Sequence, residues 1–310
     1  MTESMPADTS RHLRVAFLGI GLMGAPMTAN LLKAGFDLVL WNRTASKCEP
    51  FASQAEIAAT PAQAAAGADV VITMLENGQV VNEVLVHQGV IEAAKPGAVI
   101  IDMSSVQPSL ARDHAQRAEV RGAGYLDAPV SGGTRGAEAA VLSIMAGGCD
   151  EHLEKVRGVL EAMGSVTHIG PVGAGQLAKL ANQAIVGITI GAVSEAMLLA
   201  AKGGADPVAV RQALLGGFAG SKILEQHGQR MIDRDFAPGA PARIQLKDMR
   251  MILDEARAEG LTLPLAQQVH NEYLSLVANG HSEVDHSGLL LELEHLNGTR
   301  LGSVGPGPKE

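Results

Sequence analysis

The sequence predicts an α/β protein whose first half is a doubly wound parallel sheet and whose second half is an all-α domain. Short apolar runs alternate with helical segments through the first half, and beyond them the apolar residues recur with helical spacing only. A long apolar segment without proline separates the two patterns. Strand–helix repeats are typical of a parallel sheet covered by helices. We therefore expect two domains joined by one long helix.

The apolar runs of the first half have the length of single strands. They contain Val, Ile and Leu almost continuously, which is typical of strands covered on both faces. Repeated strand–helix units imply right-handed crossovers and parallel pairing. We expect this sheet domain to span residues 13–173. The predicted strands are "RVAFLGI", "DLVLWN", "DVVITML", "AVIIDMS", "YLDAPV" and "LSIMAGG".

The helical domain is expected to span residues 174–298 and to begin with an interdomain helix at 175–202. The segment "QLAKLANQAIVGITIGAVSEAMLLAA" is apolar on nearly all sides, so we expect it to be buried, in part by a second subunit. Small residues on one side would allow close helix approach, namely Gly187, Gly191, Ala192 and Ala196. Further helices are predicted at "DPVAVRQALL", "LKDMRMILDEARAEG", "LPLAQQVHNEYLSLVANG" and "SGLLLELEHL", and disordered tails at 1–12 and 299–310.

Composition and charge narrow the class of protein. The 310 residues are 46% hydrophobic, enough for two cores, and the net charge of −9 argues against a nucleic-acid partner. Cys48 and Cys149 form no C-x-x-C pair and suggest reduced thiols in the cytoplasm. The N-terminal segment lacks the apolar region of a signal peptide, and "AIVGITIGAV" is shorter than the roughly 20 residues of a membrane span. We expect a cytoplasmic protein without a membrane partner.

A glycine-rich loop follows the first predicted strand and precedes a helix. Gly19, Gly21 and Gly24 match the pattern G-x-G-x-x-G, in which the glycines allow a tight turn, close approach to a pyrophosphate and close helix–strand packing. The anion then lies at the helix N-terminus. Because further strand–helix units follow, we interpret the loop as the dinucleotide site of a Rossmann-type domain and not as a plain turn. The predicted contacts are Gly19, Ile20, Gly21, Leu22, Met23 and Gly24.

The end of the second predicted strand bears on which dinucleotide is bound. An acidic residue there would bind the ribose 2′-hydroxyl of NAD, and an arginine accommodates the 2′-phosphate of NADP. This chain has Asn42, Arg43 and Thr44 and no carboxylate, which favours NADP(H) over NAD(H). The alternative is that Arg43 stacks on the adenine of either cofactor. The predicted cofactor site also includes Met74 and Leu75 after the third run.

Three further stretches are candidates for a substrate site. "DMSSVQP" (102–108) follows a strand, and "DAPVSGG" (127–133) offers Ser131, Gly132 and Gly133, whose backbone N–H groups could bind an anion. In "GAGQLAKLANQ", the side chains of Lys179, Asn182 and Gln183 share one helix face. Apolar neighbours would bury Lys179 partly and suit it to proton transfer. Singly, each stretch could also be an ordinary loop or a surface lysine.

The histidines give no comparable pattern. His281 and His286 in "HSEVDHS" lack a matching set of ligands, so we predict no metal site. Asp285 or Ser287 is expected to cap the next helix.

Taken together, these motifs make the chain resemble the β-hydroxyacid dehydrogenase family from about Arg14 to Leu296. The matching stretches are "FLGIGLMGAPMTANLLKAG", "DMSSVQP", "DAPVSGG", "GAGQLAKLANQ" and "IQLKD". Within the family, "KLANQ", "GGFAGSKIL", "MIDRDFAPG" and "VDHSGL" are most similar to the tartronate semialdehyde reductase (2-hydroxy-3-oxopropionate reductase) branch. This chain has Asn182–Gln183 where many members have Asn-Asn. The difference weakens a direct transfer of residue roles from the hydroxyisobutyrate enzymes to this chain.

The resemblance implies a role for each candidate residue. Lys179 would be the general acid in reduction, Asn182 would position substrate and lysine, and Gln183 would be a further substrate contact. The substrate carboxylate would be held by Ser131, Gly132 and Gly133. Ser105 would lie beside the nicotinamide, and Lys247 would reach the cofactor from the helical domain.

The implied activity is reduction of a small aldehyde that carries a carboxylate, most simply 2-hydroxy-3-oxopropionate to glycerate. Other members of the family leave 3-hydroxyisobutyrate, L-threonate and succinic semialdehyde or glyoxylate open as substrates. A non-catalytic dinucleotide-binding interaction module is the alternative of a different class, and it would be expected to lack the lysine. A homodimer or homotetramer is expected.

Overall fold

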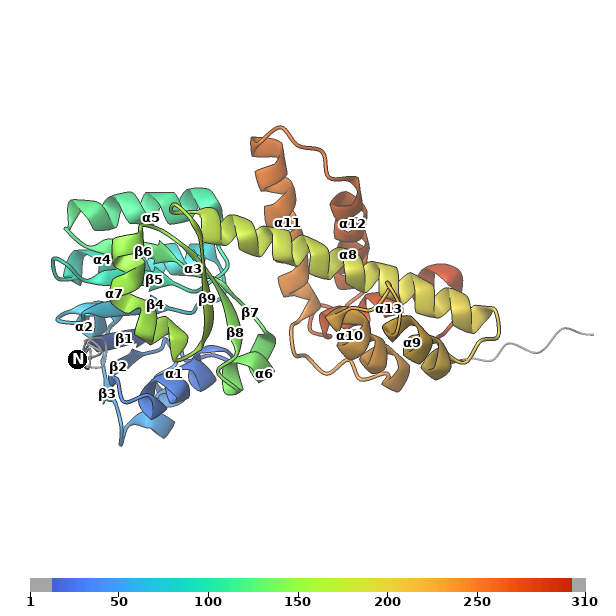
Figure 1. The fold of residues 1–310 in the computed structure, drawn as a ribbon, viewed down its shortest axis with the longest axis horizontal. Helices are drawn as coiled ribbons and strands as arrows, with labels where there is room; N and C mark the ends of the chain where they lie inside the picture. The colour runs from blue at the N-terminus through green and yellow to red at the C-terminus, as the bar shows by residue number, and fades with distance from the viewer. Residues whose placement is uncertain (1–12, 303–310) are drawn as a thin grey trace, which may run out of the picture. The chain divides into compact units, whose positions relative to one another are not determined.

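The computed structural model describes residues 13–302, and the tail predicted at 1–12 lies outside them. The chain divides into two compact units, with the boundary between Lys179 and Leu180 (Figure 1). That boundary falls within one continuous helix, α8 (Ala174–Lys202), which agrees closely with the helix predicted at 175–202.

The first unit contains a nine-stranded sheet with the order β3-β2-β1-β4-β5-β6-β8-β7, and β9 pairs with β8. The six strands from β3 to β6 in this order pair in parallel. Five of them coincide with predicted runs, and β3 was not predicted because it has only two residues. The bounds are β1 (Arg14–Leu18), β2 (Asp37–Trp41), β3 (Glu56–Ile57), β4 (Val70–Thr73), β5 (Val99–Asp102) and β6 (Gly124–Asp127).

The remaining strands add antiparallel pairs, which the sequence did not predict, to this mainly parallel sheet. Strand β8 (Leu142–Gly147) runs antiparallel to β6 and to β7 (Val130–Ser131), and β9 (Gly164–Gly170) runs parallel to β8. The link from β7 to β8 holds only the six-residue helix α6 (Gly133–Glu138). A link this short suits a return in the opposite direction, whereas a parallel crossover needs a dozen or more residues.

Helices cover both faces of the sheet, as Figure 1 shows. On one face, α1 (Gly24–Lys33) and α7 (Asp150–Glu161) pack with Phe17 and Ile72 in one core cluster. On the other face, Ala16, Leu18 and Ile100 pack with helices that lie between β3 and β6 in the chain. These are α2 (Pro61–Ala65), α3 (Gly78–Asn82), the π-turn Glu83–His87, α4 (Val90–Ala93) and α5 (Pro108–Val120), and two short 3₁₀ turns at Ala45–Lys47 and Glu49–Phe51 follow β2.

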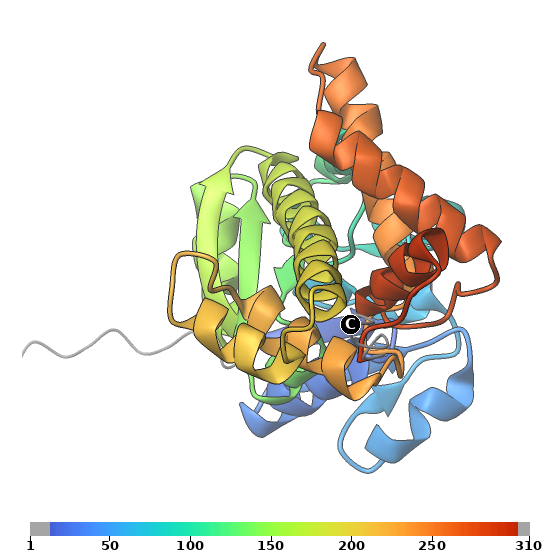
Figure 2. The ribbon, with the colours of Figure 1, turned by 90° about the vertical axis from the view of Figure 1, so that its right-hand side faces the viewer.

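The second unit is helical, as predicted. Its core joins residues of α8 to residues of the later helices, among them Met197, Met249 and Tyr273. Helices α11 and α12 lie side by side (Figures 1 and 2). Helix α10 was not predicted from the sequence. The bounds are α9 (Pro207–Leu215), α10 (Lys222–Asp233), α11 (Ala242–Ala258), α12 (Pro264–Ala278), a 3₁₀ turn at His286–Gly288 and α13 (Leu289–Asn297).

Helix α8 is less buried than its composition predicts. Gly187 faces α11, because a Cβ there would lie 2.8 Å from the Gln245 amide nitrogen. Gly191 faces α12, because a Cβ there would lie 3.4 Å from Val269 Cγ2. Ile185 and Leu199, by contrast, are 68% and 77% exposed in the single chain. Length and a mean hydropathy of 1.9 would by themselves allow α8 to cross a membrane, a test that a core helix of a water-soluble protein also passes.

The end of the described chain differs from the predicted tail. Residues 299–302 fold back on α13: the Leu301 N–H donates to Glu294 Oε1 at 2.7 Å, and the Leu301 side chain is buried. The rest of the predicted tail, 303–310, lies outside the described residues. Asp285 caps the His286–Gly288 turn by accepting from the Ser287 N–H, as expected for this position.

Candidate active site

The glycine loop has the geometry that a dinucleotide requires. Gly19 adopts φ +111°, and a Cβ there would lie 2.4 Å from the Met74 carbonyl oxygen. A Cβ on Gly24 would lie 1.9 Å from the Gly19 oxygen, so the start of α1 packs directly on the loop. Among the described residues, no atom beyond the chain neighbours of Gly21 lies within 4 Å of a Cβ built there, so its backbone is open on that side. The tight turn at Gly19 and the close packing at Gly24 agree with the predicted pattern, and the approach of a pyrophosphate to Gly21 stays a prediction.

Asn42 holds the loop in place from the end of β2. Its Oδ1 accepts from the Ile20 N–H at 2.9 Å, and its Nδ2 donates to the Thr44 carbonyl at 2.9 Å. Arg43 follows with an exposed side chain, and no acidic residue ends the strand. The site thus combines an exposed cation with an open glycine loop, which fits an anionic dinucleotide.

Met74, Leu75 and Ser105 lie at the carboxyl ends of β4 and β5. Leu75 lies beside the glycine loop, because a Cβ on Gly19 would lie 2.8 Å from Leu75 Cδ2. The Leu75 N–H donates to Ser104 Oγ at 2.9 Å. Ser105 is half-buried next to Ser104. The ends of these parallel strands therefore border the glycine loop, where open α/β sheets bind ligands.

Lys179 lies against the "DAPVSGG" segment within the first unit. Its side chain is buried, with the residue only 9% exposed, and Nζ donates to the Val130 carbonyl oxygen at 2.9 Å. Ser131 follows directly in β7, and Gly132 and Gly133 adopt positive φ angles of 138° and 61°. The buried position excludes the alternative that Lys179 is an ordinary surface residue. It brings the amine next to the predicted carboxylate site.

Asp127, at the start of the same segment, was not predicted as a site residue. Its carboxylate is fully buried and accepts from the Gly173 N–H at 2.7 Å and the Gln176 N–H at 2.8 Å. Burial raises the pKa of Asp127 to about 7, with a smaller contribution from the Asp102 charge, and the two backbone hydrogen bonds oppose this rise. The residue holds the start of α8.

Asn182, Gln183 and Lys247 belong to the second unit and lie in one polar network there. Asn182 Nδ2 donates to Gln183 Oε1 at 2.9 Å, and Gln183 Nε2 donates to Asp248 Oδ2 at 2.5 Å. Lys247 Nζ lies 3.1 Å from Asp248 Oδ1. Gln183 thereby connects α8 to the "QLKD" segment of α11. The contact needs the longer amide side chain that distinguishes this position from asparagine.

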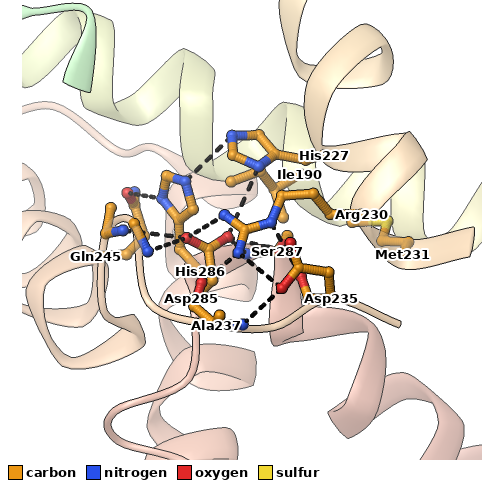
Figure 3. Close-up of polar contacts among 12 residues, drawn as sticks. Ile190, His227, Arg230, Met231, Asp235, Ala237, Gln245, Asp285, His286 and Ser287 are labelled. Atoms are coloured by element: carbon orange, nitrogen blue, oxygen red, sulfur yellow. Dashed lines mark hydrogen bonds and ion pairs between the residues drawn. The ribbon is translucent and has the colours of Figure 1, made fainter. Parts of the chain in front are cut away.

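The structure also joins His227, Asp285 and His286, a cluster that the sequence did not reveal (Figure 3). Their possible metal-ligating atoms lie within 4.8 Å of one another. The Nε2 atoms of the two histidines are 3.2 Å apart, and His286 Nδ1 lies 3.4 Å from Gln245 Oε1. His227 belongs to the unpredicted helix α10 and is 59 residues from His286 in the chain, so no local pattern could join them.

The Asp285 carboxylate is already saturated with hydrogen bonds. It accepts hydrogen bonds from four donors, which are Ser287 N, Ser287 Oγ, Gly239 N and Ala240 N, and it forms an ion pair with Arg230. A carboxylate has about four lone-pair sites, and the Arg230 guanidinium lies 3.0 Å from Oδ2. A cation would have to displace these donors beside a positive charge. We therefore interpret the cluster as a hydrogen-bonded support within the helical unit.

Comparison with known proteins assigns the family. A family model described as the NAD binding domain of 6-phosphogluconate dehydrogenase matches residues 14–170. A second, described as NAD-binding of NADP-dependent 3-hydroxyisobutyrate dehydrogenase, matches residues 173–293. These two matches follow the sheet unit and the helical unit of the fold.

Individual relatives match along nearly their whole length. The chain is 41% identical to the 2-hydroxy-3-oxopropionate reductase of Escherichia coli (strain K12), with 93% of this chain and 100% of the relative covered. It is 36% identical to the probable 3-hydroxyisobutyrate dehydrogenase-like 1, mitochondrial, of Arabidopsis thaliana, with 97% and 91% covered. A Mycobacterium tuberculosis 3-hydroxyisobutyrate dehydrogenase solved with L-serine superposes with a TM-score of 0.84 at 34% identity, with 91% and 99% covered. The chain therefore belongs to the β-hydroxyacid dehydrogenases and is an NAD(P)-binding oxidoreductase of that family.

Proposed function

We propose that the protein reduces 2-hydroxy-3-oxopropionate to glycerate, with Lys179 as the proton donor and NADP(H) as the preferred cofactor. The observation that carries the proposal is the buried Lys179 amine on the Val130 carbonyl, beside Ser131. The 41% identity to a 2-hydroxy-3-oxopropionate reductase supports this substrate over the other acids of the family.

The reaction needs a hydride and a proton. The loop Gly19–Gly24 would hold NADPH, which would supply the hydride to the aldehyde carbon. As the carbonyl oxygen becomes an alkoxide, the Lys179 ammonium would donate its proton and stabilise the developing negative charge. The backbone N–H groups around Ser131, Gly132 and Gly133 would hold the substrate carboxylate. Asn182 would orient the substrate from the next turn of α8.

The preference for NADP(H) rests on the end of β2. Arg43 is exposed there, and Asn42 and Thr44 leave no carboxylate to repel a 2′-phosphate. Arginine pairs well with phosphate because its guanidinium donates several hydrogen bonds in one plane.

The decisive experiment follows nicotinamide absorbance with a panel of acids under NADH and NADPH. The panel contains 2-hydroxy-3-oxopropionate, succinic semialdehyde and glyoxylate for reduction, and 3-hydroxyisobutyrate and L-threonate for oxidation. We expect the highest kcat/KM for 2-hydroxy-3-oxopropionate with NADPH. A higher kcat/KM for another acid would assign that acid as the substrate instead. No turnover of any acid, with NADPH still bound, would favour a non-catalytic dinucleotide-binding module.

A further inference from the structure

We infer that Asp127 and Gln176 are positioning residues for Lys179: together they fasten the first turn of α8 to the carboxyl ends of β5 and β6. The inference rests on the proposed role of Lys179 as proton donor. It assigns a function to the aspartate of "DAPVSGG" that differs from the substrate contacts expected of the rest of that segment.

Asp127 provides the first attachment. Both of its oxygens accept backbone N–H groups at the start of α8, from Gly173 at 2.7 Å and Gln176 at 2.8 Å. The first N–H groups of a helix have no partner within the helix. A buried carboxylate at this end satisfies two of them and complements the positive end of the helix dipole. The start of α8 is therefore tied to the last residue of β6.

Gln176 provides the second attachment. Its Nε2 donates to the Ser104 carbonyl oxygen at 2.8 Å, and its Oε1 accepts from the Val106 N–H at 3.1 Å. Both partners lie just after β5 in "DMSSVQP". Because the Gln176 side chain is 1% exposed, water cannot replace these hydrogen bonds easily. Helix α8 is thus tied to two neighbouring strands at once.

Close backbone packing leaves the first turn no room to shift. A Cβ on Gly175 would lie 2.3 Å from the Met145 carbonyl oxygen and 2.4 Å from the Asp127 carbonyl oxygen. A Cβ on Gly147 would lie 2.6 Å from Asp127 Oδ1. The glycines let the helix backbone rest directly on β6 and β8, so that the Asp127 carboxylate can reach its N–H groups.

The attachment at Gln176 fixes the position of Lys179 because these two residues lie one helical turn apart. Gln176 and Lys179 are three residues apart, about 4.5 Å along the helix axis. Lys179 Nζ reaches back to the Val130 carbonyl oxygen at 2.9 Å, three residues after Asp127 in the chain. The segment that anchors the helix is therefore the same segment that receives the amine. A small rotation of this turn would move the proton donor away from the carboxylate site.

The test measures kcat and KM for Asp127→Asn and Gln176→Met. The asparagine of the first variant has only one acceptor oxygen and cannot accept both N–H groups. The methionine of the second variant keeps the bulk of the side chain but loses both hydrogen bonds. We expect kcat to fall about 10- to 100-fold, because small misplacements of catalytic groups cost this much. The Kd of Asp127→Asn for NADPH should stay within about 2-fold, because this carboxylate accepts its hydrogen bonds from the start of α8 and not from the glycine loop. Gln176→Met is compared by kcat and KM alone, because Gln176 also holds the residues on both sides of Ser105.

A matched control separates the loss of a helix cap from the loss of position. Asp206 caps α9 by accepting the N–H groups of Val208 and Ala209 at 3.2 Å each. Asp206→Asn makes the same chemical change at another helix start, and we expect unchanged kcat. If Asp127→Asn does not fold, as judged by circular dichroism, Gln176→Met decides the question.

Combination with Lys179→Ala shows whether the two residues act through the lysine. If they do, adding Asp127→Asn to Lys179→Ala will lower kcat no further. A further 10-fold fall in the double variant, or full kcat in both single variants, overturns the inference. Full turnover by Lys179→Ala alone would instead overturn the proposed role of the lysine, so the two failures are distinguishable.

Discussion

The Nε2 atoms of His227 and His286 face each other at 3.2 Å, inside the helical unit. One ring must donate a proton and the other must accept it, so the accepting ring is neutral when the bond forms. Burial lowers the pKa of His286 to about 4, against a smaller opposing effect of Asp285, while His227 and Arg230 lower it further. Burial also lowers the pKa of His227.

These lowered pKa values predict a loss of stability in mild acid. Between about pH 6.5 and pH 4 the unfolded chain binds protons that the folded chain does not, so the free energy of unfolding falls as the pH falls. We expect His286 to contribute a loss of about 1–3 kcal/mol across this window. Urea unfolding at several pH values measures it. His286→Gln should flatten the slope, whereas His281→Gln, on an exposed histidine, should leave it unchanged; equal slopes in all three proteins would contradict the assignment.

Replacement of Lys179 should separate chemistry from cofactor binding. Lys179→Ala removes the proton donor, and we expect kcat to fall about 10²- to 10⁴-fold, the usual contribution of general acid catalysis. NADPH binding, measured by fluorescence titration, should change little because the glycine loop is untouched. Lys202→Ala, at the exposed end of the same helix, provides the control. Turnover of Lys179→Ala close to that of the unaltered protein would exclude the role.

Two glycines of the nucleotide loop should respond differently to alanine. A Cβ on Gly24 would overlap the Gly19 oxygen at 1.9 Å, so Gly24→Ala should lower the free energy of unfolding by about 1–3 kcal/mol. Within the part of the chain that the structure describes, nothing beyond the neighbours of Gly21 lies within 4 Å of the added carbon, so Gly21→Ala should keep the Tm but weaken NADPH binding. Thermal unfolding and cofactor titration of both variants measure the two effects. Unchanged affinity in Gly21→Ala would mean that no pyrophosphate approaches this residue.

Arg43 should decide between the two nicotinamide cofactors. Arg43→Ala removes a charged donor, and we expect the Kd for NADPH to rise about 10- to 100-fold while that for NADH changes little. The exposed side chain makes a folding defect unexpected, and Tm checks this. If both Kd values rose equally, Arg43 would contact a part that the two cofactors share, such as the adenine. Lys47→Ala, on the exposed 3₁₀ turn that follows, serves as the control.

The sequence predicted those features that depend on neighbouring residues. The glycine loop was predictable because the turn, the approach and the packing each depend on a residue within one short segment. The long parallel strands were predictable because burial on both faces leaves a continuous apolar run. Lys179 was recognisable from the motif around it, although its contact with Val130 requires the folded chain.

Features that arise from distant residues or very short elements were not predictable. Strands β3 and β7 have two residues each, too few for any period. Strand β9 is mostly exposed and therefore lacks an apolar run. The reversal at β8 is an exception, because the shortness of the link between β7 and β8 can be read from the sequence. The role of Asp127 was not predictable because its partners, Gly173 and Gln176, lie more than 40 residues away in the chain.

Because Gly187 has no side chain, α8 leaves room for the Gln245 amide of α11 and its hydrogen bonds. The Gln245 amide, which a methyl group at residue 187 would displace, donates to the Gln183 carbonyl at 3.2 Å and lies near His286 on its other side. One carbon atom more would displace the end of the Gln245 side chain and lengthen both contacts together. The bare backbone at residue 187 thus determines which groups the Gln245 amide can reach.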